Sequence, residues 1–220
     1  MNITIEIPGV RIGIVEADGV TVAPANAELL AEMDRESARL RKKFTVESLA
    51  GASAIVAVRA IFRGWGMDPS KYRPSSEALL RRVVQGKGLY NISNVVDLTN
   101  LGSIETAWPY GVYNRTAISG EISLRLGRAG EKYEGIGKRM WHLEGRPVLA
   151  DDEGPFGSPI SDSTRTQVRE GVSQVLTVIY APGNAADGEV KQALGKQSHR
   201  LETYAGAITT RADVNSVPKC

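Results

Sequence analysis

The chain has 220 residues, of which 42% are hydrophobic and 24% charged, with a formal net charge of +2 at pH 7. This composition excludes the disordered and fibrous classes, and a charge so close to zero does not by itself indicate a nucleic-acid partner. No apolar run has membrane-spanning length, and the start lacks the pattern of a secretory leader. The single cysteine, Cys220, allows no intramolecular disulfide, so we expect a cytoplasmic protein.

The N-terminal part of the chain predicts two strands followed by two helices. Residues 2–7 alternate apolar and polar side chains, and a Pro8-Gly9 turn makes Val10–Val15 the expected hairpin partner. A charged helix is expected over 26–44 and an apolar, buried helix over 46–63. The basic C-terminal half of the first helix is interpreted as a solvated face, with contact to RNA phosphates as the alternative.

Two more helices are expected between Tyr72 and Asn114. The first begins at Ser75, directly after Pro74, and is stopped by Gly86. The second, over about 95–106, mixes apolar residues with many hydrogen-bonding side chains. Burying such groups unpaired costs about 1–3 kcal/mol each, so they must find partners or face a cleft.

After residue 114 the hydrophobic period changes from that of a helix to that of a strand. Short strands are expected over 120–127, 131–136, 147–150 and 174–180. A long loop of glycines and hydroxyl residues over 151–166 separates the last two, which is a common setting for a binding site. A terminal amphipathic helix is expected over 187–204, and the tail after Gly206 is expected to be short and frayed.

Two motifs carry a resemblance to a known family. The run Asn94-Val95-Val96-Asp97-Leu98-Thr99-Asn100, with Glu105 and a turn from Pro109 to Asn114, resembles the B3/B4 (tRNA-binding, editing) domain of the bacterial phenylalanyl-tRNA synthetase beta chain. The run Tyr72-Arg73-Pro74-Ser75-Ser76-Glu77-Ala78-Leu79 is similar to a signature of freestanding proteins built from that domain alone. The resemblance covers most of residues 70–182.

The resemblance implies an α+β fold, in which helices pack on a twisted, largely antiparallel or mixed β-sheet. The whole chain, 1–220, is then expected to form a single B3/B4-like domain. We divide it into a strand-hairpin and two-helix extension over 1–69, a B3/B4 core over 70–182, and a C-terminal helix and tail over 183–220.

The resemblance also implies a freestanding editing protein that binds the 3′ end of tRNA and hydrolyses mischarged aminoacyl esters with a positioned water. It implies no cofactor and no metal, and without the synthetase's other modules the chain is not expected to charge a tRNA alone. We expect a polar cleft between the helix over 94–105 and the loop over 157–166. The residues expected to hold the substrate and water, or to polarise the ester carbonyl, are Asn94, Asp97, Asn100, Gly157, Ser158 and Thr166. Those expected to line the substrate pocket are Glu105, Tyr110, Gly111, Asp162, Thr177 and Val178, and those expected to contact RNA are Arg73, Arg81, Arg82, Lys87 and Arg165.

Several of these residues have a structural alternative. Asn94, Asp97 and Asn100 are of the types that cap helices and tie loops together. For Arg73, anchoring of its own loop is the preferred interpretation. A non-catalytic module that binds tRNA, other RNA or an amino-acid-like ligand on the same scaffold is therefore the alternative function.

Two positions depart from the synthetase pattern. Gly111 stands where the synthetase has a His, and Thr177 or Val178 stands where it has the Glu that meets the hydroxyl of a tyrosine substrate. A site without its hydrogen-bonding partner loses selectivity for a hydroxylated substrate, so specificity for tyrosine is not expected.

Metal ligands are poorly represented. His142 and His199 are far apart, which leaves no zinc-binding spacing. The adjacent carboxylates of Asp151, Asp152 and Glu153 are interpreted as solvated turn residues rather than a cation site.

Overall fold

The computed structural model describes residues 1–216, and Cys220, on which the disulfide argument rests, lies outside the described residues. The helices are α1 (Ala27–Lys43), α2 (Val46–Leu49), α3 (Ser53–Gly64), α4 (Ser75–Val84), α5 (Asn94–Thr106) and α6 (Asp187–Ala205). The strands are β1 (Ile3–Ile5), β2 (Val10–Asp18), β3 (Tyr110–Asn114), β4 (Ile122–Leu126), β5 (Lys132–Glu134), β6 (Met140–His142), β7 (Pro147–Asp151), β8 (Gly154–Gly157), β9 (Gln174–Pro182) and β10 (Ile208–Ser216).

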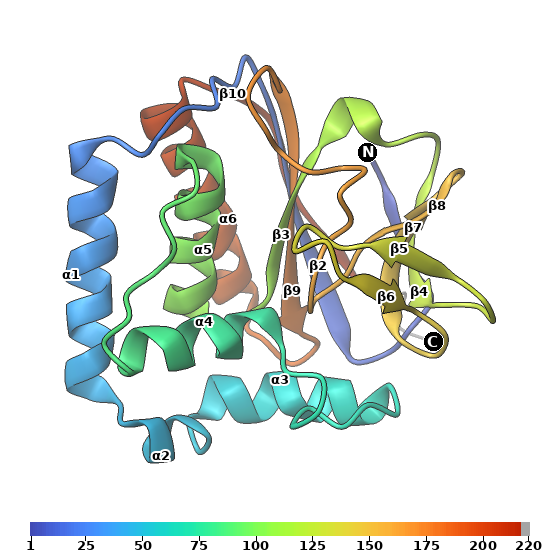
Figure 1. The fold of residues 1–220 in the computed structure, drawn as a ribbon, viewed down its shortest axis with the longest axis horizontal. Coiled ribbons are helices and arrows are strands. Elements are labelled where there is room, and N and C mark those ends of the chain that lie inside the picture. Colours follow the sequence, from blue (N-terminus) through green and yellow to red (C-terminus); the bar gives the residue numbers. More distant parts are fainter. Residues whose placement is uncertain (217–220) are drawn as a thin grey trace.

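Two four-stranded sheets form the framework. The central sheet has the strand order β10-β2-β9-β3 and is antiparallel throughout. The outer sheet has the order β1-β4-β7-β8, in which β1 runs parallel to β4. Helices α1, α4, α5 and α6 lie on one side of the central sheet and the outer sheet lies on the other, while α3 runs across the lower end of the central sheet (Figure 1). The expected α+β fold, with helices packed on a largely antiparallel, mixed sheet, is confirmed.

The two inner strands of the central sheet, β2 and β9, are covered on both faces, which explains why they are buried along almost their whole length and not only at alternate residues. All residues of β9 after Gln174 are buried, and Ile14 of β2 stands opposite Val178. Helix α6 packs closely on β2 because Gly13 has no side chain: a Cβ there would lie 3.1 Å from Cδ2 of Leu194.

Helix α5 lies at the centre of the helical layer, in contact with α1, α4, α6 and β3. The hydroxyl of Thr99 donates to the carbonyl oxygen of Val95 (2.8 Å), and the hydroxyl of Ser103 donates to the carbonyl oxygen of Trp108 (2.7 Å). The buried amide of Gln197 in α6 donates to the hydroxyl oxygen of Thr99 (3.1 Å). These polar side chains of α5 are therefore paired inside the protein.

The expected N-terminal hairpin is wrong, although both of its strands exist. The two edges of β2 are occupied by β9 and β10, which leaves no free edge for β1. Strand β1 crosses instead to the outer sheet and pairs with β4, with Thr4 opposite Ser123.

The single helix expected over 46–63 is two helices, α2 and α3. The interruption at 50–52 contains Gly51, and glycine is among the residues least favourable to a helix interior. The frayed tail expected after Gly206 is also wrong, since β10 pairs with β2 along the edge of the central sheet. No helix within residues 1–216 is both long and apolar enough to cross a membrane.

Candidate functional site

The two walls of the expected cleft lie on opposite faces of the central sheet (Figure 1). Thr177 of β9 faces the helices, because its hydroxyl accepts a hydrogen bond from Gln197 of α6 (3.3 Å). The next residue, Val178, and its partner Gly111 on β3 face the outer sheet. The sheet therefore separates α5 from the loop over 157–166, and the expectation of one cleft between them is wrong.

Asn94 is buried at the start of α5, where it joins three segments of the chain. Its side-chain oxygen accepts from the N–H of Ala23 (3.0 Å). Its amide donates to the carbonyl oxygens of Thr21 (2.9 Å) and Tyr204 (2.8 Å). All of these contacts belong to the fold, in agreement with the structural alternative for this residue.

Asp97 is also enclosed, and its carboxylate holds the loop before α5 by accepting from the N–H of Ile92 (3.0 Å). Burial raises the pKa of Asp97 to about 6, against the opposing effect of its backbone hydrogen bonds. Asn100, one turn further along, is half-buried on the same helix. The hydrogen bonds of Asn94 and Asp97 all go to segments other than the loop over 157–166.

Glu105 and Tyr110 belong to the helical side as well. The carboxylate of Glu105 pairs with Arg200 (2.7 Å) and Lys196 (3.3 Å) of α6. The ring of Tyr110 packs on α5, since a Cβ at Gly102 would lie 2.8 Å from its Cε2 atom. These two residues and Thr177 therefore line no common pocket with Gly111 and Val178.

On the opposite face, a buried polar group joins β3 to the loop after β8. Oδ1 of Asp162 accepts from the hydroxyl of Tyr113 (2.8 Å) and from the N–H of Ser158 (3.1 Å). Asp162 as a residue is partly exposed, but its carboxyl group lies deep in the protein. Burial raises the pKa of Asp162 to about 6, although both hydrogen bonds act in the other direction.

Tyr113 fills the space between two glycines of this site. A Cβ at Gly111 or at Gly157 would lie 2.6 Å from Cζ of Tyr113, so the ring needs glycine on both sides. We call Gly111, Tyr113, Gly157, Ser158 and Asp162 the Tyr113–Asp162 cluster. Sequence reasoning missed Tyr113, although residues 111 and 113 of one strand must share a face.

Two of the expected substrate contacts are occupied within the chain. The N–H of Ser158, expected to polarise an ester carbonyl, donates to Asp162. Thr166 is fully buried, and its hydroxyl donates to the carbonyl oxygen of Phe156 (3.4 Å). In this conformation neither group is free to bind a substrate.

Several of the basic residues expected to contact RNA are engaged in ion pairs. The buried carboxylate of Glu77 accepts from Arg59 (2.7 Å) and Arg81 (2.8 Å). Burial opposes the charged form of Glu77, but these guanidinium groups outweigh it and hold its pKa below the usual value. Arg73 is more exposed and lies 3.7 Å from the same carboxylate.

Arg165 is held even more firmly. Its guanidinium donates to Asp151 (2.8 Å) and to the carbonyl oxygen of Ala117 (2.9 Å), and it pairs with Glu153 (3.2 Å). These contacts anchor the loop after β8 to the outer sheet. The guanidinium that was expected to meet a terminal phosphate is therefore committed to the fold.

The last two expected RNA contacts lie at the far end of α4. The guanidinium carbon of Arg82 lies 4.0 Å from the centroid of the Tyr90 ring. Lys87 is exposed in the turn that follows the helix. Within residues 1–216, neither Arg82 nor Lys87 forms a hydrogen bond or ion pair with a member of the Tyr113–Asp162 cluster.

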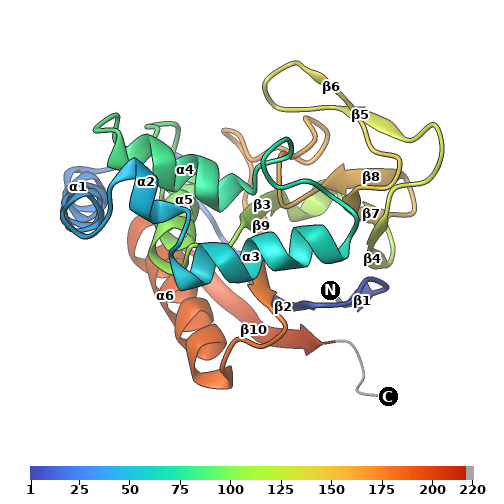
Figure 2. The same ribbon diagram turned by 90° about the horizontal axis from the view of Figure 1, so that it is seen from below.

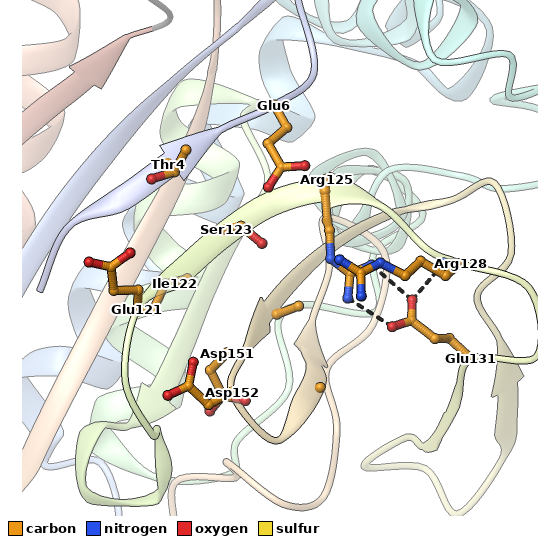
Figure 3. Close-up of a pocket in the computed structure, with 12 residues that line it drawn as sticks. Thr4, Glu6, Glu121, Ile122, Ser123, Arg125, Arg128, Glu131, Asp151 and Asp152 are labelled. Atoms are coloured by element: carbon orange, nitrogen blue, oxygen red, sulfur yellow. Dashed lines mark hydrogen bonds and ion pairs between the residues drawn. The ribbon is translucent and has the colours of Figure 1, made fainter.

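A polar hollow of about 390 Å³ lies on the outer sheet, away from the cluster. Arg125 and Arg128 gather beside Glu131 at one end, and Glu121 and Asp152 lie at the other (Figure 3). In the described part of the chain, no three His, Cys, Asp or Glu side chains are grouped so that they could hold a metal ion.

The fold and the cluster define an α+β domain whose buried polar site lies between two sheets. The chain belongs to the B3/4 domain family, whose model matches residues 57–202. This confirms the resemblance found in the sequence.

The curated relatives that the chain resembles include beta subunits of phenylalanine–tRNA ligase. The chain is 30% identical to that of Thermobifida fusca over 128 residues, which are 57% of this chain and 15% of the relative. It is 34% identical to that of Streptomyces avermitilis over 93 residues, which are 42% of this chain and 11% of the relative. The chain thus spans less than one sixth of the length of these relatives.

Among solved structures, the crystal structure of an N-terminal fragment of the phenylalanyl-tRNA synthetase beta subunit from Pyrococcus horikoshii gives a TM-score of 0.44 with 16% sequence identity. The likeness covers 95% of this chain and 50% of that one.

Proposed function

We propose that this domain binds the acylated 3′ end of a tRNA and hydrolyses the ester bond to a wrongly attached amino acid. Membership of the B3/4 family and the similarity to phenylalanine–tRNA ligase beta subunits support the tRNA part of the proposal. The observation that carries the hydrolytic part is the Asp162 carboxyl group. Its pKa of about 6 lies close to neutral pH, where a general base is most effective.

In the proposed reaction, the Asp162 carboxylate accepts a proton from a water molecule, and the oxygen of that water attacks the ester carbonyl carbon. The bond between this carbon and the ribose oxygen then breaks. The proton held by Asp162 passes to the departing ribose oxygen, which leaves a free amino acid and a tRNA with an intact terminal hydroxyl. The N–H of Ser158 is assigned to the carbonyl oxygen once it is released from Asp162.

Substrate entry requires a change at Tyr113, because its ring occupies the space between Gly111 and Gly157. Rotation of this side chain would open a space of aromatic size and free one acceptor position on Asp162. The proposal therefore includes Tyr113 as the side chain that closes the site in the absence of substrate.

One observation favours a second candidate, a module that binds tRNA without cleaving it. The hydroxyl of Tyr113 and the N–H of Ser158 both donate to Asp162 within the Tyr113–Asp162 cluster, and local hydrogen bonds of this kind are common structural devices. Binding without turnover would need no movement of Tyr113.

Incubation of the 220-residue chain with a panel of mischarged tRNAs tests the two candidates. The hydrolase proposal expects deacylation of at least one of them above the buffer rate, and loss of that activity in Asp162→Asn. Asp97→Asn is the matched comparison, since Asp97 is a buried carboxyl group of similar pKa on the other face of the sheet. If no tRNA is deacylated while tRNA still binds, the non-catalytic candidate is the correct one.

A further inference from the structure

Four side chains from two segments of the chain, one at residue 72 and one over 139–146, form a stack beside the Tyr113–Asp162 cluster. The guanidinium carbon of Arg146 lies 4.3 Å from the centroid of the Tyr72 ring and 6.0 Å from that of Trp141. The guanidinium carbon of Arg139 lies 4.8 Å from the Trp141 centroid. We call Tyr72, Arg139, Trp141 and Arg146 the arginine–aromatic stack.

The cations of this stack are free of carboxylate partners. Within residues 1–216, neither Arg139 nor Arg146 forms an ion pair, and the same is true of Lys71, whose ammonium lies 5.4 Å from the Tyr72 centroid. By contrast, Arg81 and Arg165 each pair with a carboxylate at 2.8 Å. The positive charge next to the site is therefore available to an anionic partner.

Stacking on aromatic rings also leaves the guanidinium groups in an orientation in which they can bind an anion. A guanidinium that lies on a ring keeps its N–H edge free, and its planar fork matches a phosphate. Arg146 uses one donor on the hydroxyl of Tyr72 (3.0 Å), which fixes its orientation. Arg139 is exposed and makes no side-chain hydrogen bond within the described residues.

The stack is joined directly to the loop that carries Asp162. The N–H of Ser75, three residues after Tyr72, donates to the carbonyl oxygen of Pro159 (3.0 Å). The N–H of Ile136, at the turn between β5 and β6, donates to the carbonyl oxygen of Asp162 (3.0 Å). Trp141 itself covers Gly135 of that turn, where a Cβ would lie 2.7 Å from its indole nitrogen.

The β5–β6 hairpin adds apolar surface around these cations. It projects from the body of the molecule beyond the outer sheet (Figure 2). Ile136 and Met140 on it are 45% and 50% exposed. Apolar and aromatic surface beside unpaired cations suits a partner that alternates bases with phosphates.

We propose that the arginine–aromatic stack binds the single-stranded 3′ end of an RNA, with Arg139 and Arg146 on its phosphates and Trp141 beside its bases. The choice of RNA as the partner rests on the proposed function. The arginine–aromatic stack then holds the RNA strand at the edge of the loop that carries Asp162. These residues were not among the RNA contacts expected from the sequence.

Fluorescence anisotropy with a labelled single-stranded RNA ending in CCA tests the proposal, using the whole chain over a series of salt concentrations. Arg139→Gln is expected to weaken binding about threefold to tenfold at low salt and to reduce the slope of log K against log salt by about 0.7, the value for one phosphate contact on a single strand. Trp141→Leu, which keeps an apolar side chain against Tyr133 and Leu143, is expected to weaken binding about tenfold.

Lys191→Gln is the matched control, because it removes one exposed positive charge from α6. This variant is expected to bind the RNA with an affinity within about twofold of wild type, because a charge far from the RNA contacts is screened by salt. The proposal is overturned if Arg139→Gln binds as wild type does, if Lys191→Gln loses as much affinity, or if the wild-type chain does not bind the RNA. A deacylation assay on the same proteins separates the two proposals, since RNA binding through the stack without any ester cleavage would overturn only the hydrolase.

Discussion

The hydroxyl of Tyr113 donates a 2.8 Å hydrogen bond to Oδ1 of Asp162, and so ties the edge strand of the central sheet to the loop that follows β8. In our proposal the side chain of Tyr113 closes the site and the carboxyl group of Asp162 is the general base, and this hydrogen bond connects the two. Its removal should therefore affect both the stability and the acid–base behaviour of the protein.

Tyr113→Phe removes this donor and leaves a buried acceptor with one partner fewer. We expect a loss of about 1–3 kcal/mol in the free energy of unfolding, measured by urea denaturation. The hydrogen bond lowers the pKa of Asp162, so its loss should raise that pKa above about 6. A fitted pKa of Asp162 that stays unchanged in the variant, measured by carboxyl NMR titration, would contradict this assignment.

Gly111→Ala should be destabilising because the new methyl group would meet the ring of Tyr113. Overpacking of this kind costs about 1–3 kcal/mol. In a Tyr113→Ala background the same change should cost much less, since the ring is gone, and a double-mutant cycle measures the difference. Equal costs in the two backgrounds would show that the ring does not occupy this space.

Glu77 is the shared partner of Arg59 and Arg81, and its side chain is only 1% exposed. Glu77→Gln breaks both pairs and should lower the free energy of unfolding by roughly 3 kcal/mol, as for a buried pair that loses one member. Glu36→Gln breaks a pair with the half-exposed Arg39 and should cost less than about 1 kcal/mol. Similar costs for the two variants would contradict a structural role for Glu77.

Asp97 should make the free energy of unfolding fall as the pH rises, which is the opposite of the usual effect of a carboxyl group. Burial raises its pKa from 3.8 to about 6, so its contribution to stability is fully present below pH 3.8 and is lost as the pH rises through about 6. Glu77 and Glu131, whose pKa values are lowered, contribute in the opposite direction, so the comparison must be with a variant. Asp97→Asn should gain stability relative to wild type between pH 4 and 7, measured by urea denaturation at each pH. A difference that is constant with pH would show that Asp97 is not perturbed.

Much of the fold follows from hydrophobic period and turn residues. The helices α1, α4, α5 and α6 begin and end within one or two residues of their expected limits, because caps and glycines mark them. The pairing of β1 with β4 could not be found this way, because strand partners depend on which edges other strands leave free. Strand β10 was missed because an edge strand carries exposed polar residues, as a loose tail does.

The candidate site was predicted only in part. Gly111, Gly157, Ser158 and Asp162 lie together around the ring of Tyr113, and their role in binding a substrate stays a prediction. The α5 residues do not join them, because α5 packs on the other face of the central sheet. Side chains of one strand alternate between the two faces, so Gly111 and Tyr113 meet the outer sheet and not α5. Asn94 and Asp97 are instead placed by backbone groups of the segments around Ala23 and Ile92, which no local pattern reveals.

The rate of ester cleavage as a function of pH tests the central claim most directly. Single-turnover deacylation of a mischarged tRNA by the wild-type chain, corrected for the buffer rate, should rise with pH through about 6 and then level off, as the Asp162 carboxyl group loses its proton. Asp162→Asn should lower the plateau by about 10²- to 10⁴-fold and remove the inflection. An Asp162→Asn chain that cleaves at the wild-type rate, or a folded wild-type chain that cleaves no faster than buffer, would contradict the account.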